Sequence, residues 1–264
     1  MERENKKLKL ISGDYYKQYI MHVSIRKLLS IRRIKVKDIS RDDFEYYFIG
    51  SSLYSSKIEG NTLDADSFFR NRKRVGFPKK KQVSEIEDLI LAYKFAFKNK
   101  LTKTNFLKVH RLLSKTILPL KERGKITKHQ MGIRDSVTLK PVYMAVEPEH
   151  VNAELGKLFY DIAELIKRKL SVRETFYYAS MIHAWIAKIH PFTDGNGRSA
   201  RLLEKWFLSS KLGTAAWSIR SEKYYWDHKE EYYTNIALGY NYYALHWERC
   251  IPFLLMLPKS VNPL

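Results

Sequence analysis

Residues 183–201 read HAWIAKIHPFTDGNGRSAR, and the pattern changes character half-way along this stretch. Before the proline, apolar side chains recur at helical spacing, which predicts a helix over 175–189 with one buried face. Pro191 should end that helix, because the residue before a proline is driven out of the α region. A second helix is predicted to begin near Asn196 or Gly197, after a short loop. The stretch therefore predicts two packed helices joined by a tight, glycine-containing loop.

The charges at the start of the second helix stand in an unfavourable place. Arg198 and Arg201 fall in the first turn, where unpaired N–H groups already form a positive pole. Their spacing of three puts both on one helix face. Gly195 and Gly197 permit unusual backbone angles and a close approach by a ligand. Exposed amides, a helix N-terminus and two guanidinium groups are together typical of a polyphosphate site.

Two further side chains of this loop supply the chemistry of a polyphosphate reaction. Asp194 can hold Mg²⁺, which binds proteins through one or two carboxylates plus phosphate oxygens. His190 can take a proton from an incoming hydroxyl. These parts favour phosphoryl or nucleotidyl transfer. The alternative is a structural turn with solvated arginines and a capping Asp194, and the number of local rules broken together disfavours it.

Residues 190–201, HPFTDGNGRSAR, match every fixed position of the signature of Fic-domain proteins (HPF, any residue, D or E, GNGR, two of any residue, R). The resemblance implies an all-α fold with a short β-hairpin flap over the active site. It also implies transfer of AMP from ATP and Mg²⁺ to a hydroxyl side chain of a target protein. The roles that it carries over are general base for His190, core anchor for Phe192, metal ligand for Asp194, anion nest for Gly195, Asn196 and Gly197, and phosphate clamps for Arg198 and Arg201.

A second segment, SSKIEGN at 55–61, carries a misplaced acid. Residues 42–58 predict a helix, and Gly60 is a natural helix terminator. Glu59 then lies at the negative pole of that helix. The unfavourable placement of this carboxylate and of the arginines near Arg201 would be relieved if the two groups met in the fold. The alternative is an exposed acid without consequence.

Residues 55–60 also resemble the inhibitory motif of Fic proteins (S or T, three of any residue, E, then G or N), in the class with an N-terminal inhibitory helix. The resemblance gives Ser55, Glu59 and Gly60 an inhibitory role. It implies that Glu59 pairs with Arg201, so that the γ-phosphate cannot seat. Such arginine–carboxylate pairs are often bidentate. In some relatives the same glutamate positions a water that removes AMP.

Two regions beyond the motifs are assigned by the resemblance. Residues 124–146 contain Gly and Pro with β-like alternation at 137–139 and 142–144, which predicts a hairpin. As a flap it would hold the target as an added strand, with candidate docking residues Val137, Thr138, Leu139, Val142 and Tyr143. An aromatic residue is expected beside adenine, with Tyr232 and Tyr233 as candidates. Core packing is the alternative for these rings.

Periodicity organises the rest of the chain. Residues 1–82 are predicted as an N-terminal helical region carrying the inhibitory helix at about 42–60, and residues 83–264 as the catalytic domain with its closing helices, in one compact unit. His110 is expected to be packed and hydrogen-bonded rather than catalytic. Helices are predicted over 83–98 (capped by Ser84), 104–117 and 148–169, a helical face over 15–30, and a connection without helix over 61–82.

The composition indicates a folded, strongly basic protein. The 264 residues are 45% hydrophobic, and 48 Lys and Arg against 28 Asp and Glu give a formal charge of +20. This balance fits either a basic surface with a nucleotide pocket or a nucleic-acid partner. The single cysteine, Cys250, excludes an intrachain disulfide and fits a reducing compartment. Without a signal peptide or an apolar run of membrane length, we predict a cytoplasmic protein with no membrane partner.

The sequence therefore predicts an autoinhibited protein adenylyltransferase that modifies a target protein and itself, with AMP removal as a second activity. A homodimer is a further expectation from the resemblance. Two alternatives stay open: transfer of UMP or phosphate, and a basic nucleic-acid-binding regulator without catalysis. The intact GNGR run disfavours phosphate transfer. The regulator explains neither the arginines nor Glu59, and a basic balance alone is nonspecific.

Overall fold

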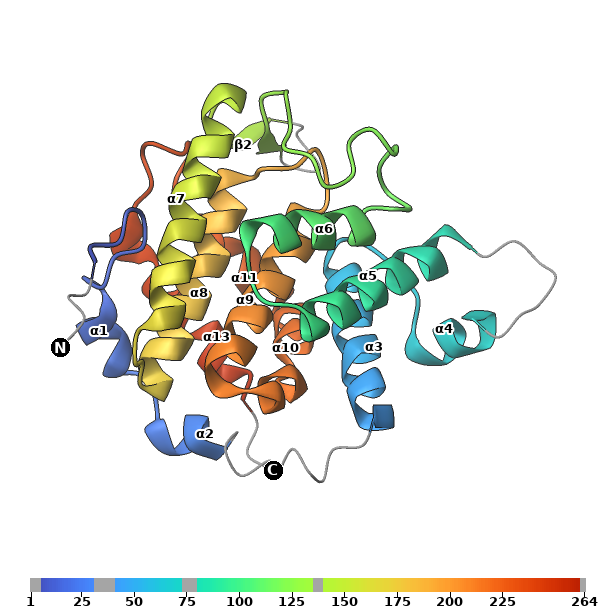
Figure 1. The fold of residues 1–264 in the computed structure, drawn as a ribbon, viewed down its shortest axis with the longest axis horizontal. Helices are drawn as coiled ribbons and strands as arrows, with labels where there is room; N and C mark the ends of the chain where they lie inside the picture. The colour runs from blue at the N-terminus through green and yellow to red at the C-terminus, as the bar shows by residue number, and fades with distance from the viewer. Residues whose placement is uncertain (1–5, 31–40, 73–79, 135–139, 262–264) are drawn as a thin grey trace.

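The computed structural model describes residues 6–30, 41–72, 80–134 and 140–261. Within these ranges helices dominate, and two short strands form one hairpin (Figure 1). The helices are α1 (Tyr16–Ile20), α2 (Ile25–Leu29), α3 (Arg41–Ile58), α4 (Ala65–Arg72), α5 (Lys81–Lys98), α6 (Lys103–Leu113), α7 (Pro148–Lys167), α8 (Val172–Ile189), α9 (Asn196–Leu212), η3 (Thr214–Ser218), α10 (Ser221–Asp227), α11 (Lys229–Ile236), η4 (Trp247–Arg249), α12 (Ile251–Leu254) and α13 (Met256–Lys259).

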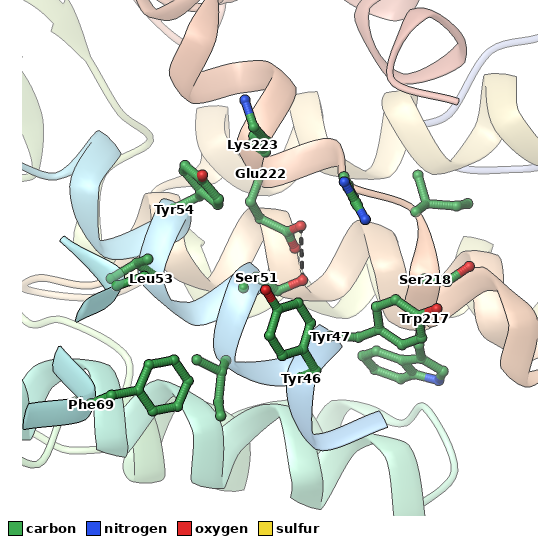
Figure 2. A pocket seen from close by; sticks show the side chains of 15 residues that line it. Tyr46, Tyr47, Ser51, Leu53, Tyr54, Phe69, Trp217, Ser218, Glu222 and Lys223 are labelled. Carbon is green, nitrogen blue, oxygen red and sulfur yellow. Dashed lines mark hydrogen bonds between the residues drawn. The ribbon is translucent and has the colours of Figure 1, made fainter. Parts of the chain in front are cut away.

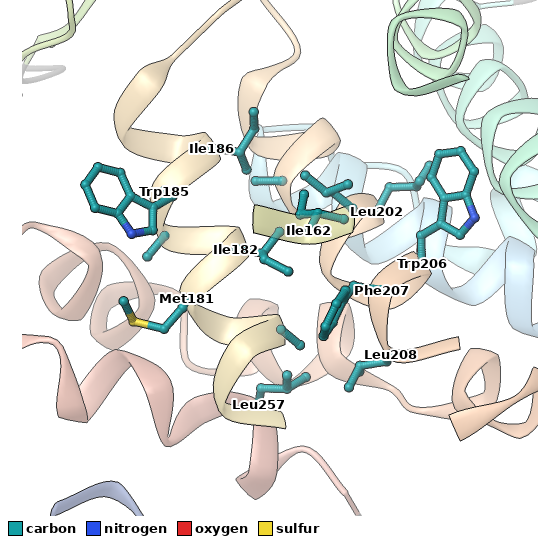
Figure 3. Close-up of a cluster of buried hydrophobic side chains, with 14 of the residues drawn as sticks. Ile162, Met181, Ile182, Trp185, Ile186, Leu202, Trp206, Phe207, Leu208 and Leu257 are labelled. Carbon is teal, nitrogen blue, oxygen red and sulfur yellow. The ribbon is translucent and has the colours of Figure 1, made fainter. Parts of the chain in front are cut away.

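The centre of the fold is the pair α8 and α9, which the sequence predicted. Figure 3 shows Ile182 and Ile186 of α8 facing Leu202 and Phe207 of α9. All four side chains are fully buried. Burial of each such side chain contributes about 1.5–3 kcal/mol, so this seam fixes the two helices against one another. The loop between them is thereby held on a rigid base.

The ends of these two helices follow from local chemistry. Ser171 and Glu174 form a reciprocal capping box at the start of α8. α8 ends at Ile189, just before Pro191, as predicted. α9 begins at Asn196, after Gly195 with a left-handed φ of 83°. The HPFTDGNG segment therefore spans one helix C-terminus, a loop and one helix N-terminus.

The N-terminal part packs on this centre. The Asp161 carboxylate of α7 is buried and accepts the backbone N–H groups of Lys9, Leu10 and Ile11. On α3, the ring of Phe48 packs against Trp217 of η3, with centroids 5.7 Å apart. The main hydrophobic cluster thus contains residues from both sides of residue 82. The division of the chain at that residue stays a prediction.

Four expectations about helices were inaccurate. The predicted connection over 61–82 contains α4, because Asp64 Oδ1 accepts the N–H of Ser67 and Phe68 is buried. Ser84 lies inside α5, whose N-cap is Lys80. The helix predicted to 117 ends at Leu113, since the backbone N–H of Thr116 turns to the Asp88 carboxylate. The face predicted over 15–30 is split between α1 and α2.

The hairpin pairs β1 (Gly132–Arg134) with β2 (Pro141–Met144) in antiparallel register, Ile133 opposite Tyr143. The predicted strand at 142–144 is therefore present, whereas 137–139 lies outside the described residues. In the described ranges, every helix is too short or too polar to cross a membrane.

Candidate active site

The loop between α8 and α9 is a fixed structure. Asn196 holds the loop through hydrogen bonds of both its side-chain amide oxygen and its side-chain amide nitrogen. Its Oδ1 accepts the N–H of Phe192 at 2.9 Å, and its Nδ2 donates to the carbonyl of Phe192 at 2.7 Å. The Phe192 ring is fully buried. These contacts hold the loop in shape.

His110 of α6 supports the same loop from outside it. Its Nδ1 accepts the N–H of Gly124, and its Nε2 lies 2.9 Å from the carbonyl oxygen of Asp194. Because an amide N–H can only donate and a carbonyl can only accept, the proton must be on Nε2. Burial lowers the pKa of His110 to about 4. This histidine is therefore neutral, in one tautomer, and packed as the sequence predicted.

His190 caps the C-terminus of α8 in a strained conformation. Its φ of 51° makes it the one non-glycine residue with positive φ in the described parts of the chain, an arrangement that costs about 1–3 kcal/mol. Its Nδ1 lies 3.3 Å from the carbonyl of Ala187, so Nδ1 carries the proton. Nε2 is left with its lone pair. Burial lowers the pKa of His190, which keeps the ring a neutral base.

The start of α9 presents donors without side-chain caps. The first amides of a helix have no intrahelical acceptor, and no side chain caps α9. Arg198 donates from Nη2 to Asp194 Oδ1 at 3.1 Å, while its Nε is buried with no partner in the described structure. Arg201, one turn on, is fully buried. Such a cluster of donors suits a multiply charged anion.

The Glu59 carboxylate lies against these donors at the start of α9. Its Oε1 accepts a hydrogen bond from Arg201 Nη2 at 2.7 Å. The carboxylate also rests on Gly197, where an added Cβ would lie only 2.3 Å from Oε1. Burial alone would raise the pKa of Glu59, but Arg201 and Arg198 outweigh it and hold that pKa below its usual value. The pairing predicted for Glu59 and Arg201 is thus present, through one guanidinium nitrogen.

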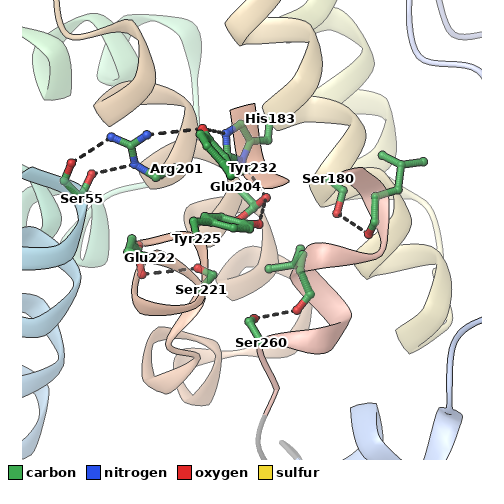
Figure 4. A network of polar contacts seen from close by, with 12 residues as sticks. Ser55, Ser180, His183, Arg201, Glu204, Ser221, Glu222, Tyr225, Tyr232 and Ser260 are labelled. Carbon is green, nitrogen blue, oxygen red and sulfur yellow. Dashed lines mark hydrogen bonds and ion pairs between the residues drawn. The ribbon is translucent and has the colours of Figure 1, made fainter. Parts of the chain in front are cut away.

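Arg201 has partners besides Glu59. On the α3 side, its Nε donates to Ser55 Oγ and its Nη2 to the Ser55 carbonyl, both at 3.0 Å. On the inner side, its Nη1 lies 3.4 Å from the hydroxyl of Tyr232. Behind Tyr232, Figure 4 shows His183 between that hydroxyl, at 2.9 Å, and Glu204, at 2.8 Å. The guanidinium is therefore oriented independently of Glu59.

Comparison with known proteins agrees with this geometry. The sequence profile of the Fic/DOC family matches residues 100–208. Residues 100–208 are a Fic/DOC domain. Two relatives, both named protein adenylyltransferase Fic, come from Aedes aegypti and Drosophila erecta and are each 27% identical to it, over 169 and 158 residues. The matches cover 59% and 57% of this chain and 31% and 30% of those proteins, so the chain spans about a third of their length.

Solved structures share the Fic fold. A Fic family protein from Desulfovibrio desulfuricans superposes with a TM-score of 0.75, covering 97% of this chain and 74% of that one at 18% identity. A Fic domain containing signaling protein from Bacteroides thetaiotaomicron gives 0.65, covering 94% of each chain at 19% identity. The predicted all-α Fic fold with a β-hairpin is confirmed.

Within the Fic motif, the side chains of two residues are paired with other residues of the motif. The side chain of Asn196 is 4% exposed and fully engaged with Phe192, so only its backbone N–H can face an anion. The Asp194 side chain is 51% exposed and paired with Arg198. Among described residues no three His, Cys, Asp or Glu side chains form a metal site. A single accessible carboxylate still fits Mg²⁺, which can take its other ligands from phosphate and water.

The flap prediction needs correction at Tyr143. Its ring is 3% exposed and its hydroxyl donates to the carbonyl of Lys188 at 2.6 Å, so this side chain faces inward and cannot dock a target. Alternation along β2 leaves Val142 exposed. The outer edge of β2 is already bonded at Met144, which exchanges hydrogen bonds with the backbone of Tyr240 and Tyr242. The docking role of Val142 stays a prediction, and Val137, Thr138 and Leu139 lie outside the described residues.

The two candidate adenine residues lie on α11, and Tyr233 contacts the end of α3. Tyr232 is buried beside Arg201. Tyr233 is 45% exposed, and its hydroxyl donates to the carbonyl of Ile58 at 3.2 Å. Their place beside adenine stays a prediction. The sequence analysis did not identify His183 and Glu204 as support for Tyr232. The available signal was a polar residue on each of two otherwise apolar helix faces.

Proposed function

We propose that this chain is an autoinhibited protein adenylyltransferase, which transfers AMP from ATP to a Ser, Thr or Tyr hydroxyl of a target protein and of itself. The contact that carries the proposal is the Glu59–Arg201 pair, set on the first turn of α9. The names of the relatives support it, although the chain spans only about a third of those proteins. A cytoplasmic location and a homodimer stay predictions.

The site residues divide the chemistry among them. Arg198, Arg201 and the first amides of α9 bind the β- and γ-phosphates. Nε2 of His190 accepts the proton of the target hydroxyl, whose oxygen attacks the α-phosphorus. The bond from that phosphorus to the bridging oxygen breaks, and pyrophosphate leaves. Asp194 would hold Mg²⁺, which would neutralise charge on the departing phosphates.

Inhibition follows from competition for the same donors. The Glu59 oxygen occupies Arg201 Nη2 and the open face of Gly197, so a γ-phosphate oxygen cannot reach either. The negative charge of Glu59 also acts on His190, whose pKa it raises against the lowering effect of burial. This proximity favours AMP removal as a second activity of the site, with Glu59 positioning the attacking water.

The test compares wild type, Glu59→Gly, His190→Ala and the double variant, each incubated with ATP labelled at the α- or γ-phosphate. We expect self-labelling from the α position only, strong in Glu59→Gly and absent whenever His190 is replaced. Label from the γ position would show phosphate transfer instead, and stronger labelling by UTP would show UMP transfer. Absence of label in every variant, with salt-dependent retention on DNA, would favour a nucleic-acid-binding regulator.

A further inference from the structure

A cavity of about 190 Å³ lies between α3, α4, η3 and α10, away from the Fic motif (Figure 2). Five of its lining residues are aromatic: Tyr46, Tyr47, Tyr54, Phe69 and Trp217. No residue of the segment 190–201 borders it. An apolar cavity of roughly 150 Å³ takes up benzene in an engineered protein. The cavity therefore has room for one aromatic ring with a small substituent.

The polar groups of the cavity favour an anionic substituent. On one side, Ser51 Oγ donates to Glu222 Oε2 at 3.0 Å, and the buried Lys205 ammonium neutralises that carboxylate. Arg220 also borders the cavity and is exposed, and no hydrogen bond or ion pair of its guanidinium is found within the described structure. An unpaired guanidinium beside aromatic walls suits a ring that carries a carboxylate or phosphate.

A glycine keeps this space open. Gly50 lies in the middle of α3 and borders the cavity, and an added Cβ would meet no heavy atom within 4 Å. Glycine inside a helix is about 1 kcal/mol less favourable than alanine. Neither a positive φ nor a close backbone contact requires glycine here. The missing side chain has one structural effect, which is to leave the cavity unfilled.

We propose that this cavity is a regulatory site for a small aromatic anion, and that its occupant holds α3 in the inhibitory position. This inference rests on the proposed autoinhibition. α3 supplies about half of the lining residues, and Ser55 follows Ser51 by about one helical turn on the same helix. Withdrawal of α3 would dismantle the cavity and the Glu59–Arg201 contact together. A ligand that binds only while α3 is seated must stabilise the seated state.

Binding is tested without nucleotide, using benzoate and phenyl phosphate as probes and benzamide as the neutral match of benzoate. Gly50→Leu should fill the cavity and abolish binding without lowering the melting temperature, whereas Gly50→Ala should leave most of the space and retain binding. Arg220→Gln should weaken benzoate about tenfold and leave benzamide unchanged. Equal binding to wild type and Gly50→Leu, or no saturable binding of either anion, would overturn the site.

Regulation is tested with α-labelled ATP. Benzoate should lower the residual self-labelling of wild type and leave that of Glu59→Gly unchanged. If benzoate binds wild type but raises its labelling, the direction of regulation is wrong. If Glu59→Gly shows no labelling at all, the proposed function fails, while the comparison of wild type with Gly50→Leu still decides whether the cavity binds anions.

Discussion

The imidazole of His110 lies flat against the phenyl ring of Phe192, with 3.6 Å between centroids and 5° between ring planes. His110 belongs to α6 and Phe192 to the loop that follows α8. The same imidazole holds the carbonyl of Asp194, two residues further along. A residue outside the signature thus fixes the two loop positions on either side of Thr193.

The burial of His110 predicts that acid destabilises the fold. The His110 pKa is about 4 in the folded protein against 6.5 for an ordinary imidazole. Between these values the unfolded chain binds more protons, so acid favours unfolding. The free energy of unfolding keeps its full value above pH 6.5. It decreases as the pH falls toward 4, by at most about 3 kcal/mol from this group. Urea unfolding at several pH values measures it.

The control for this effect is His110→Gln, which keeps a polar side chain but removes the titrating group. Its stability should fall less steeply than that of wild type between pH 6.5 and pH 4. Identical slopes for the two proteins would show that His110 is not the group responsible.

The pH dependence of labelling reports on His190. Because burial lowers its pKa, the base form persists below the usual imidazole range. In Glu59→Gly, where the charge that raises this pKa is gone, the rate of self-labelling should stay level down to pH 6.5 and decline only below it. Rates followed from pH 5 to pH 8.5 test this. A decline that begins above the ordinary imidazole pKa would contradict it.

Ser55 should support inhibition more weakly than Glu59 does. Ser55→Ala removes one acceptor of Arg201 and leaves the Ser55 carbonyl in place. We expect a loss of about 1 kcal/mol in stability and self-labelling between that of wild type and Glu59→Gly. Ser56→Ala is the matched control, because the buried Ser56 hydroxyl has no hydrogen-bond partner in the described structure. Equal labelling by the two alanine variants would argue against a role for the Ser55 hydroxyl.

The buried ion pair beneath α3 should matter for folding. Lys205 donates to Glu222, which also accepts from Tyr93. Lys205→Met would leave the Glu222 charge buried without its cation, a change that costs about 3–5 kcal/mol. The double variant Lys205→Met with Glu222→Gln should regain much of this loss in urea unfolding. A double variant as unstable as the single one would mean that packing of the lysine stem, rather than charge, is the cause.

The sequence was most informative where a motif broke local rules. Arginines in the first turn of α9 and a glutamate at the end of α3 are each unfavourable alone, and the fold brings Glu59 onto Arg201. Helix ends marked by Pro191 and Gly195 were also readable, because those residues act locally. A local signal was sufficient in each of these cases.

Contacts between distant segments were not readable in the same way. The support that His110 gives to Asp194 joins residues 84 positions apart, and no local rule encodes it. α4 escaped prediction because its one buried ring, Phe68, stands among charged residues. Tyr143 was assigned to the wrong face because β2 is too short for alternation to show which side is inward.

Under the proposed autoinhibition, the position of the Glu59 carboxylate on Gly197 limits which substitutions can activate the protein. The Glu59 carboxylate occupies the space beside the α-carbon of Gly197, and a bound phosphate would need the same space. A larger residue at position 197 would exclude both the Glu59 carboxylate and the nucleotide phosphate. Activating substitutions should therefore arise in α3 and its surroundings. There they can withdraw Glu59 and leave the phosphate site at the start of α9 intact.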